Sequence, residues 1–299
     1  MTQHSISSLR ILLIGNTGQL GWELQRTLAP LGEVEAFDYP SVDLLNVEST
    51  RQLVRQCQPD LIVNAAAYTA VDRAEAEPDL AHAVNAIAPG VLAEEALHLG
   101  AALIHYSTDY VFDGLKAAPY VESDSPNPLS VYGRTKLEGE LEVQQAGGAY
   151  IILRTSWVYS LRGDSFVNKV LRWSRSEPLL KLVADQVSSP TWARMLAEVT
   201  ALVLAKGSDL IRERTGLYHL AGGGYASRFE WAQEILKLDP NRDQQAVKHL
   251  LPAATRDFPT PAQRPLFSAL DCSHFENTFG LCLPAWKDSL SMGMESDRT

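Results

Sequence analysis

Short apolar runs alternate with longer segments of helical spacing through the first half of the chain. The apolar runs predict buried strands at Arg10–Ile14, Glu33–Phe37, Leu61–Asn64, Ala101–Tyr106 and Ile151–Arg154. Between them, helical spacing of apolar residues predicts helices at Gln19–Leu31, Val47–Cys57, Ala81–Leu99 and Ser130–Gln145. The third of these helices precedes Gly100, a residue type that commonly ends helices. Strands that alternate with helices predict an α/β fold, in which helices cover both faces of a parallel sheet.

The order of elements loosens after about residue 155. Helical patterns continue at Phe166–Ser174, Ala193–Ala205 and Arg228–Leu238, but Gly222–Gly224 and the proline-dense segment 252–265 separate them. We therefore expect two parts. Residues 1–155 form a regular α/β domain, and residues 156–299 form a smaller, irregular part that is interleaved with it. The polar segment from Gly293 onward is expected to be frayed.

Composition and charge place the chain among globular proteins that do not bind nucleic acids. Of its 299 residues, 45% are hydrophobic and 21% are charged, which is ordinary for a globular protein. The formal net charge is -10, whereas binding to a nucleic-acid backbone needs Lys and Arg to neutralise phosphates. The three cysteines lack metal-ligand spacing and indicate a reducing compartment. The first ten residues lack the apolar core of a signal peptide, so we expect a soluble, cytoplasmic protein.

A glycine-rich loop follows the first predicted strand. The run Gly15-Asn16-Thr17-Gly18-Gln19-Leu20-Gly21 has the form G-x-x-G-x-x-G and opens a predicted helix. Glycines at these places let the backbone approach a pyrophosphate, and a helix N-terminus supplies N–H donors. This order of strand, glycines and helix predicts a dinucleotide site that uses Gly15, Thr17, Gly18, Gln19 and Leu20. The alternative is an ordinary turn between a strand and a helix.

Further residues fit the remainder of a dinucleotide. Asp38 comes about 20 residues after Gly18, where a carboxylate can accept hydrogen bonds from the adenosine ribose. No arginine stands near it in the sequence to bind a 2′-phosphate, which favours NADH. Asp43 and Leu44 are candidates to flank the adenine, and Ala65-Ala66-Ala67 would let a cofactor lie close to the backbone. Ordinary turn and packing roles are the alternatives for these residues.

Three side chains form a candidate set for proton transfer. Tyr132 and Lys136 are four residues apart in a predicted helix and therefore share one face. A lysine ammonium beside a phenol favours the phenolate, so we expect Lys136 to lower the pKa of Tyr132. Thr108, at the end of a predicted strand, can hold the reacting oxygen. Behind a nucleotide loop this set predicts hydride transfer to or from a carbonyl, whereas a chance surface pair is the alternative.

With these motifs, the chain resembles the extended short-chain dehydrogenase/reductases. Within them it is most similar to the dTDP-4-dehydrorhamnose reductase branch, and the resemblance runs nearly end to end. The glycine loop and Val131-Tyr132-Gly133-Arg134-Thr135-Lys136 are shared across the superfamily. Two strings are more specific to the branch: Ser107-Thr108-Asp109-Tyr110-Val111-Phe112-Asp113-Gly114 and Arg154-Thr155-Ser156-Trp157-Val158-Tyr159. The family pattern is also matched by the run Asn64-Ala65-Ala66-Ala67-Tyr68-Thr69-Ala70-Val71-Asp72 and by the pair Arg264-Pro265.

The resemblance implies a Rossmann-type doubly wound sheet in residues 1–155, which bind the dinucleotide and carry the catalytic residues. Residues 156–299 would mainly bind substrate. It implies reduction of the C4 ketone of a dTDP-4-dehydro-6-deoxy sugar by NADPH or NADH, with Tyr132 as proton donor assisted by Lys136 and Thr108. Tyr106 would lie near the cofactor. The sugar pocket would be shaped by Val71, Asp109, Tyr110 and Trp157. Arg264, with Arg162 and Lys169 behind it, is the candidate for the substrate diphosphate.

Two positions bear on whether the chain is a dehydratase and whether it binds a metal. Dehydratases of the superfamily carry a glutamate after Thr-Asp, whereas this chain has Tyr110, which argues against dehydration. Some members are associated with a divalent cation such as Mg²⁺ at a subunit contact. Glu23 matches one acidic position, but Arg194 stands where another carboxylate is expected, so we expect no metal.

Three alternatives stay open from the sequence. The catalytic set would equally suit a reductase or an epimerase that acts on another nucleotide sugar. A non-catalytic regulatory subunit of the same fold is the third, against which the intact Thr108, Tyr132, Lys136 and Trp157 argue. We expect a small-molecule substrate and no nucleic-acid or membrane partner. Whether the chain forms a homodimer stays open, because one sequence shows no interface.

Overall fold

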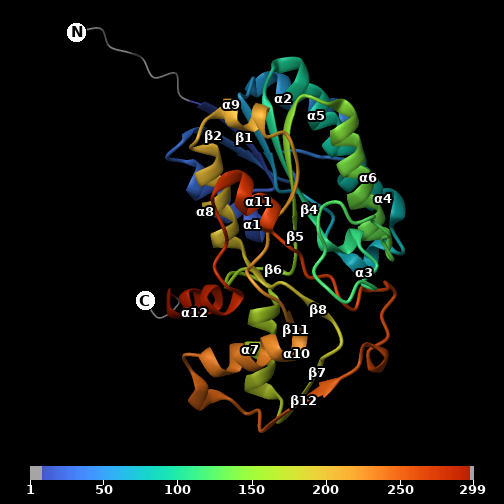
Figure 1. Cartoon of the computed structure of the whole chain (residues 1–299), viewed down its shortest axis with the longest axis vertical. Helices are drawn as coiled ribbons and strands as arrows, with labels where there is room; N and C mark the ends of the chain where they lie inside the picture. Colours follow the sequence, from blue (N-terminus) through green and yellow to red (C-terminus); the bar gives the residue numbers. More distant parts are fainter. Residues whose placement is uncertain (1–8, 297–299) are drawn as a thin grey trace, which may run out of the picture.

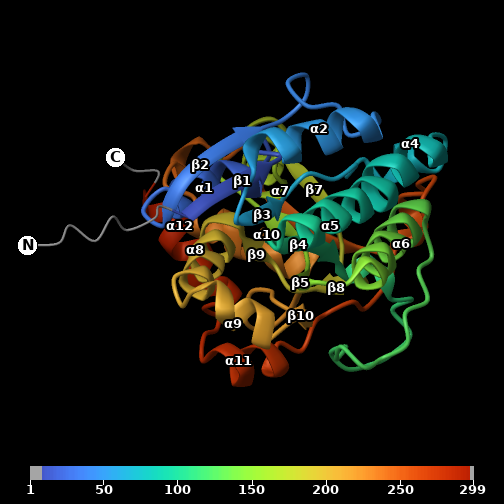
Figure 2. The ribbon, with the colours of Figure 1, turned by 90° about the horizontal axis from the view of Figure 1, so that it is seen from above.

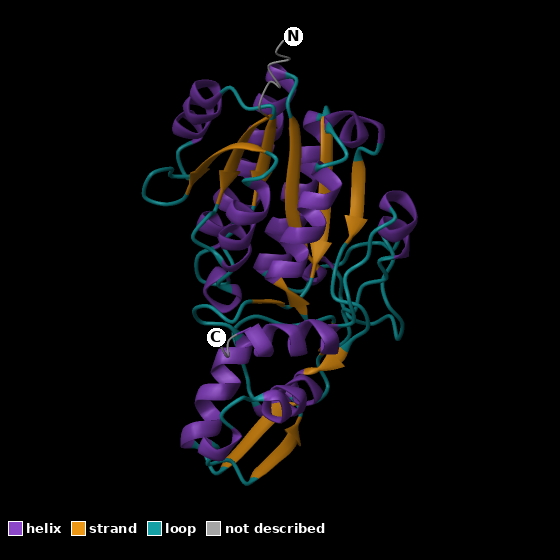
Figure 3. Ribbon diagram, turned by 90° about the vertical axis from the view of Figure 1, so that its left-hand side faces the viewer, coloured by secondary structure: helices purple, strands orange, loops and turns teal. Residues whose placement is uncertain are grey.

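The computed structural model describes residues 9–296 and contains a six-stranded parallel sheet (Figure 3). Its strands follow the order β10-β5-β4-β3-β1-β2. Their bounds are β1 Leu9–Ile14, β2 Gly32–Phe37, β3 Leu61–Asn64, β4 Ala102–Thr108, β5 Ala149–Thr155 and β10 Gly216–His219. All neighbouring pairs run parallel. The predicted doubly wound α/β fold is therefore confirmed.

Helices cover both faces of this sheet (Figure 2). One face packs on α1 Gln19–Leu28, α8 Ala193–Leu204, α9 Ser208–Glu213 and α11 Ser273–Phe279, and the other on α2 Val47–Cys57, α5 Ala88–Leu99 and α6 Val131–Ala146. Alternate strand residues divide between the two faces: Ile11 and Leu13 pack toward α1, whereas Leu12 and Ile14 pack toward α2. Because both faces are buried, the strands read as continuous apolar runs.

The strand order places a topological switch between β1 and β3. The chain moves from β1 outward to β2, and then returns past β1 to β3, β4 and β5. Loops that leave β1 and β3 in opposite directions open a crevice at the carboxyl ends of these strands, which is where open α/β sheets bind ligands. The glycine loop and the segment after β3 lie at this edge.

The long helix predicted at Ala81–Leu99 is divided in the structure. It consists of α4 Pro78–His82, a π-helical turn at Ala83–Ile87, and α5. In a regular α-helix the ring of Pro89 would clash with the carbonyl of Asn85. The wider turn relieves that contact, and the Asn85 carbonyl oxygen instead lies against Gly139 of α6, where a Cβ atom would come within 2.0 Å of it. The helix ends as predicted at Gly100, whose φ is 67°.

The second half of the chain contributes to two regions (Figure 1). Its segments α8, α9, β10 and α11 complete the sheet domain. The remainder forms a smaller lobe around Trp231, which packs with Tyr159 and Trp286. The elements of that lobe are β6 Val158–Tyr159, α7 Phe166–Ser176, β7 Leu179–Val183, β8 Val187–Ser188, β9 Thr191–Trp192, β11 Ala226–Ser227, α10 Arg228–Leu238, β12 His249–Ala253 and α12 Trp286–Ser296. The remaining short helices are α3 Val71–Ala74 and the 3-10 turns Asp109–Val111, Arg242–Gln244 and Thr255–Asp257.

Several elements were not predicted from the sequence. β7 pairs with β12, and β10 extends the main sheet, within segments that carried no strong pattern. The prediction of a frayed segment from Gly293 is wrong up to Ser296, because α12 continues to that residue. Residues 297–299, and residues 1–8 on which the signal-peptide expectation rested, lie outside the described residues. Within 9–296, no helix is both long and apolar enough to cross a bilayer.

Candidate active site

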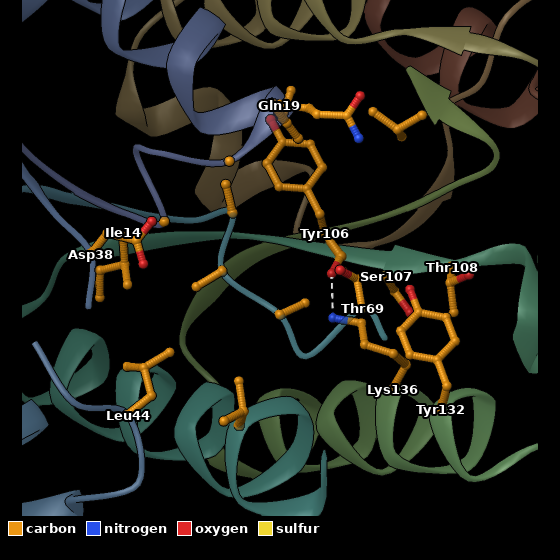
Figure 4. A pocket seen from close by; sticks show the side chains of 18 of the residues that line it. Ile14, Gln19, Asp38, Leu44, Thr69, Tyr106, Ser107, Thr108, Tyr132 and Lys136 are labelled. Carbon is orange, nitrogen blue, oxygen red and sulfur yellow. Dashed lines mark hydrogen bonds between the residues drawn. The ribbon is translucent and has the colours of Figure 1, made fainter. Parts of the chain in front are cut away.

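A cavity of about 740 Å³ opens at the carboxyl ends of β1, β3 and β4. It brings together segments that are far apart in the sequence, including the glycine loop, the end of β2, the alanines after β3, the end of β4 and the first turns of α6 (Figure 4). Predicted site residues that line it are Gly15, Thr17, Gly18, Gln19, Leu20, Asp38, Asp43, Leu44, Ala65, Ala66, Ala67, Tyr106, Thr108, Asp109, Tyr132, Lys136 and Trp157. Thr69, Ser107, Thr155 and Ser156 also line it and were not predicted.

The glycine loop is shaped for close backbone approach. Gly15 has a φ of 89°, and a Cβ atom there would lie 2.6 Å from the Ala66 nitrogen. At Gly21 a Cβ atom would come within 1.9 Å of the Gly15 carbonyl oxygen, so this glycine lets α1 pack against the loop. Gly18 differs, because its nearest neighbour would be 3.4 Å away. Packing within the protein therefore does not require a glycine at position 18, whereas a ligand that crosses it would.

The N-terminus of α1 is available to an anion. No side chain caps this helix, whose N-cap residue is Gly18. The first N–H groups of a helix lack partners within the helix and carry partial positive charge. The buried Thr155 hydroxyl also lines the cavity and has no hydrogen-bond partner among the described residues. These features fit a dinucleotide whose diphosphate lies across Gly18 and whose polar groups reach Thr155.

The adenosine end of the cavity carries negative charge. The Asp38 carboxylate accepts hydrogen bonds from the Thr17 hydroxyl, from the Thr17 backbone N–H at 3.1 Å, and from the Tyr39 N–H at 2.8 Å. Asp43 accepts a hydrogen bond from the Leu45 N–H at 3.0 Å. Among the described residues that line the cavity, Lys136 is the only cationic side chain, and it lies at the opposite end. This charge pattern favours free ribose hydroxyls over a 2′-phosphate.

Tyr132 and Lys136 project from the first turns of α6 toward the end of β4 (Figure 4). Ser130 caps this helix by accepting a hydrogen bond from the Gly133 N–H. The Lys136 ammonium donates to the Tyr106 carbonyl at 2.6 Å, and its Nζ lies 3.3 Å from Nε2 of the buried His105. The Thr108 hydroxyl is a hydrogen-bond partner of the Tyr132 phenol. The structure thus brings the three predicted catalytic side chains together.

Burial dominates the titration of this set. Desolvation raises the pKa of Tyr132, and the hydrogen bond with Thr108 opposes that shift. Desolvation also lowers the pKa of Lys136 to about 8, an effect that the charge of Glu140 opposes. We expected Lys136 to lower the pKa of Tyr132, but in this structure the pKa of Tyr132 is raised. The lysine is engaged with Tyr106 and His105, so it does not offset the desolvation of the phenol.

A buried ion pair fixes α6 to the sheet. Arg154 at the end of β5 donates to Glu140 of α6 through Nε at 2.8 Å and a second nitrogen at 2.6 Å. The Ser107 hydroxyl donates to the same carboxylate at 2.5 Å. Both charged side chains are nearly inaccessible, with exposed fractions of 4% for Arg154 and 1% for Glu140. This contact holds the helix that carries Tyr132 against the strand that carries Thr108.

Asp109 is held by serines from the second half of the chain. Its carboxylate accepts hydrogen bonds from Ser268 at 2.5 Å, from Ser188 at 2.9 Å and from Thr108 at 3.2 Å. Desolvation raises the pKa of Asp109 to about 6, although these hydrogen bonds oppose the shift. The carboxylate therefore joins the catalytic strand end to the smaller lobe.

The remaining predicted residues occupy different places. Trp157 adopts a φ of 41°, in the left-handed region that non-glycine residues rarely occupy. The Tyr110 ring meets the Tyr132 ring edge-on at 5.8 Å, and its hydroxyl is a hydrogen-bond partner of Arg264. Val71, at the start of α3, does not line this cavity. The Tyr106 hydroxyl is 2.8 Å from the Thr200 hydroxyl.

The candidates placed behind Arg264 lie elsewhere. Arg162 stacks on the Trp22 ring of α1, with 3.7 Å between the guanidinium carbon and the ring centroid. Lys169 pairs with Asp164 at 3.0 Å. The structure instead places Arg228, which sequence reasoning missed, beside Trp157. An arginine at a helix start carries no signal that distinguishes it from a surface charge.

An ion pair between Arg194 and Glu198 lies at the candidate metal position. Arg194 donates a hydrogen bond to Glu198 at 2.8 Å, and this hydrogen bond, with the charges of Glu198 and Glu23, raises the pKa of Arg194. Within residues 9–296 no three His, Cys, Asp or Glu side chains gather as a metal site would require. That no metal binds here stays a prediction.

Known proteins resemble this chain over nearly its full length. The family model described as "RmlD substrate binding domain" matches residues 9–298. A dTDP-4-dehydrorhamnose reductase of Burkholderia thailandensis is 41% identical over 293 residues, which cover 95% of this chain and 97% of the relative. A solved dTDP-4-dehydrorhamnose reductase from Clostridium acetobutylicum has a TM-score of 0.89 at 37% identity, covering 97% of this chain and 99% of that one. Another, from Bacillus anthracis in complex with NADP, has a TM-score of 0.88 at 33% identity, with the same coverage of 97% and 99%. The family resemblance read from the motifs is confirmed.

Proposed function

Because the chain belongs to the family described as the RmlD substrate binding domain, we propose that it is an NAD(P)H-dependent dTDP-4-dehydrorhamnose reductase. The reaction is reduction of the C4 ketone of dTDP-4-dehydro-6-deoxy-L-mannose, also called dTDP-4-dehydro-L-rhamnose, to dTDP-L-rhamnose. The observation that carries the proposal is the convergence of Thr108, Tyr132 and Lys136 in the cavity that the glycine loop also lines. Hydride source and proton donor would then face one substrate carbonyl.

The proposed roles follow from the contacts of each side chain. A bound NADH or NADPH supplies the hydride that adds to C4. The Tyr132 phenol, protonated because burial raises its pKa, donates its proton to the C4 oxygen as that oxygen gains charge. The Thr108 hydroxyl, which partners the phenol, hydrogen-bonds the same oxygen. Lys136 holds the nicotinamide ribose and supplies positive charge beside the phenolate left on Tyr132.

The charge at the adenosine end of the cavity supports NADH as the better cofactor, with NADPH accepted more weakly. Asp38 places a carboxylate beside the adenosine position, and no arginine lines the cavity within the described residues. A 2′-phosphate would approach that carboxylate without a compensating cation, which weakens binding. We therefore expect a lower KM for NADH than for NADPH.

The site also bears on assembly and location. Every side chain of the proposed catalytic set comes from one chain, so a homodimer would carry two complete sites and a monomer one. We propose a cytoplasmic enzyme, because the dTDP-sugar and the reduced nicotinamide are both soluble metabolites. The proposed division, with residues 1–155 binding the dinucleotide and residues 156–299 mainly binding substrate, is supported by the fact that both parts contribute lining residues to the cavity, such as Thr155 and Trp157.

Turnover tests the proposal directly. Oxidation of NADH or NADPH is followed at the nicotinamide absorbance in the presence of dTDP-4-dehydro-6-deoxy-L-mannose, and the product is identified as dTDP-L-rhamnose. The same assay with a UDP-linked 4-keto sugar is the matched control, and we expect it to be slow. Absence of turnover with both cofactors would refute the reductase, and conversion of the sugar without net oxidation of cofactor would indicate an epimerase.

A further inference from the structure

A buried histidine that has no part in the proposed reaction lies against Lys136. His105 belongs to β4 and has an exposed fraction of 0%, and Asn64 and Lys136, which contact it, have 1% each. It is on the same face of the sheet as Leu103, two residues earlier in the strand, which packs toward α5 and α6. Because buried polar groups need hydrogen-bond partners, the partners of the two ring nitrogens indicate what His105 does.

The contacts of Asn64 assign the tautomer of His105. Asn64 ends β3 and is aligned with His105 in the parallel ladder. Its side-chain oxygen accepts a hydrogen bond from the Ala66 N–H at 3.1 Å, so its side-chain nitrogen is the atom that lies 3.1 Å from Nδ1 of His105. An amide nitrogen can only donate a hydrogen bond. Nδ1 therefore accepts, and the neutral ring carries its proton on Nε2.

The Nε2–H of His105 faces the end of the Lys136 side chain, with 3.3 Å between the two nitrogens. The lysine also donates a hydrogen bond to the Tyr106 carbonyl at 2.6 Å (Figure 4). An ammonium has three donors and no lone pair, whereas a neutral amine can accept a hydrogen bond. The contact with His105 is therefore a hydrogen bond when Lys136 is neutral and a repulsion between two N–H groups when Lys136 is charged.

Charged and titratable groups from three elements surround Lys136. On α6 itself these are Tyr132 and Glu140, and on β4 it is His105. The charge of Glu140 favours the ammonium, but Arg154 of β5 donates two hydrogen bonds to that carboxylate, and burial still lowers the pKa of Lys136 to about 8. Burial, with the charge of Lys136, also holds the pKa of His105 well below its ordinary value. The ring therefore stays neutral and keeps one N–H for the lysine.

We propose that His105 is a positioning residue that acts through Lys136 and sets the pH above which the reductase loses activity. Together with the Tyr106 carbonyl, its ring holds the end of the lysine in place, and its Nε2–H weakens the hold of Lys136 on the ionising proton. The proposal rests on the proposed function, because there the Lys136 charge supports the phenolate left on Tyr132. When the pH rises and Lys136 becomes neutral, the amine accepts the His105 hydrogen bond and that support is lost.

The tautomer can be measured without any turnover. Long-range proton–nitrogen NMR spectra of the imidazole rings distinguish a proton on Nε2 from one on Nδ1. The chain has seven histidines, and the signal that disappears in His105→Asn belongs to His105. We expect a neutral ring protonated on Nε2 from about pH 6 to about pH 9, with NADH bound and without it. A proton on Nδ1, or on both nitrogens, would overturn the proposal.

Two variants test the effect on the reaction through the pH dependence of kcat. His105→Gln replaces the fixed donor with an amide whose oxygen can turn toward the Lys136 ammonium. The charge then persists to higher pH, so we expect the alkaline limb of the kcat profile to move upward by about one pH unit, the equivalent of one hydrogen bond to a charged group. His105→Asn is too short to reach Lys136. It should lower kcat by roughly three- to tenfold, more than His105→Gln does, while the KM for the sugar stays within about twofold.

His98→Asn is the matched control, because His98 is exposed in the last turn of α5, and it should keep the wild-type profile. A His105→Gln enzyme whose alkaline limb stays in place, with a loss of kcat that follows its thermal midpoint, assigns His105 to packing alone and refutes the proposal. A limb that moves to lower pH means that the wild-type ring accepts a hydrogen bond from the ammonium, which also refutes it. If the wild type shows no turnover, the proposed reaction fails, and the NMR spectra still decide whether His105 presents its N–H to Lys136.

Discussion

At the scale of single residues, the surroundings of Tyr132 keep its phenol protonated, as the proposed role of proton donor requires. Burial raises the pKa of its phenol, and Thr108 is the hydroxyl that partners it. The neighbouring Lys136, whose pKa burial lowers to about 8, carries a charge that the site stabilises poorly. A proton donor with a high pKa is matched to an oxygen that becomes strongly basic as hydride adds, because the transfer then becomes favourable late in the reaction.

Replacing Tyr132 with Phe removes the proposed proton donor and leaves the ring. We expect kcat to fall by about 10²- to 10⁴-fold, the usual contribution of general acid catalysis. The Kd for NADH, measured by fluorescence titration, should stay within about twofold because the ring still fills its place. Tyr150→Phe, on β5 outside the cavity, is the matched control and should keep full activity. A Tyr132→Phe enzyme with a near-normal rate would assign the proton to another group.

The raised pKa of Asp109 predicts a pH-dependent gain in stability for Asp109→Asn. The folded carboxyl has a pKa of about 6 against an ordinary value of 3.8, so between these values the folded state binds a proton that the unfolded state has released. Wild-type stability therefore decreases as the pH rises through this window. Asn cannot titrate, so relative to wild type it should gain about 2 kcal/mol in unfolding free energy between about pH 4.5 and about pH 7.5.

Urea unfolding at the two pH values measures this gain. Asp113→Asn is the control, because the Leu115 N–H and Asn127 lower the pKa of Asp113 and the sign is reversed. Its stability relative to wild type should not increase with pH. If the unfolding free energies of both variants changed equally with pH, the buried serine contacts of Asp109, and not its charge, would determine its contribution to stability.

The sequence predicts a site residue when the partners of that residue lie close to it in the chain. Tyr132 and Lys136 were found because one helix carries both, and Thr108 because a predicted strand ends there. The contacts of Asp109 with Ser188 and Ser268 span 79 and 159 residues, and no local pattern reports them. Arg228 was missed for the same reason, since Trp157 and Tyr110 are distant in sequence.

At the scale of elements, the loop between β1 and α1 separates two uses of glycine. Gly21 is required by packing, because a Cβ atom would meet the Gly15 carbonyl oxygen at 1.9 Å. Gly18 has room for a Cβ atom, with its nearest neighbour at 3.4 Å. The two positions therefore respond differently to the same substitution.

Alanine at each position tests the difference. Gly21→Ala should lower the unfolding free energy by about 1–3 kcal/mol or more, because backbone must move to admit the methyl group. Gly18→Ala should leave the thermal midpoint nearly unchanged and raise the Kd for NADH by roughly tenfold or more, since the methyl group would occupy the path of the diphosphate. Thermal unfolding by circular dichroism and NADH titration distinguish them. Normal NADH binding by Gly18→Ala would place the diphosphate elsewhere.

The strands found from the sequence are those buried on both faces. Runs such as Leu61–Asn64 are apolar throughout because the sheet is covered on both sides. β7 and β12 are partly exposed and pair only with each other. The four residues of β10, Gly-Leu-Tyr-His, include only one aliphatic side chain and are half-buried at the start, so none of these strands produces a continuous apolar run. Helices were found where an apolar stripe faced the sheet. The division of the helix at Pro89 depends on α6, which local spacing cannot report.

At the scale of the whole molecule, the sheet domain is completed by the second half of the chain. One face of the sheet is covered by Leu196 and Leu204 of α8 and by Phe275 and Phe279 of α11, all of them buried. β10 adds the edge strand beside β5. The sequence indicated an interleaved arrangement but not which segments return, because the returning strand β10 is only half-buried and lacks an apolar run.

A fragment that ends at residue 155 should therefore not fold alone. It would expose the apolar face that α8 and α11 cover, so we expect aggregation and no cooperative thermal transition. The matched control is the full chain cut once at the exposed positions 162–164 with both pieces retained, which should keep its transition and bind NADH. Sedimentation and circular dichroism measure both. A cooperative, NADH-binding fragment would show that residues 1–155 are an independent domain.

The return of β10 also sets an order of events during synthesis on the ribosome. The strand ends at His219, 64 residues after β5 ends at Thr155 (219 − 155). At synthesis rates of about 5–20 residues per second, the nascent chain carries an incomplete sheet for about 3–13 s before this edge strand emerges. During that interval the edge of β5 and the uncovered apolar face are open to chaperones and to neighbouring nascent chains. Slow synthesis between these two strands would lengthen the exposure and reduce the yield of folded enzyme without any change in its sequence.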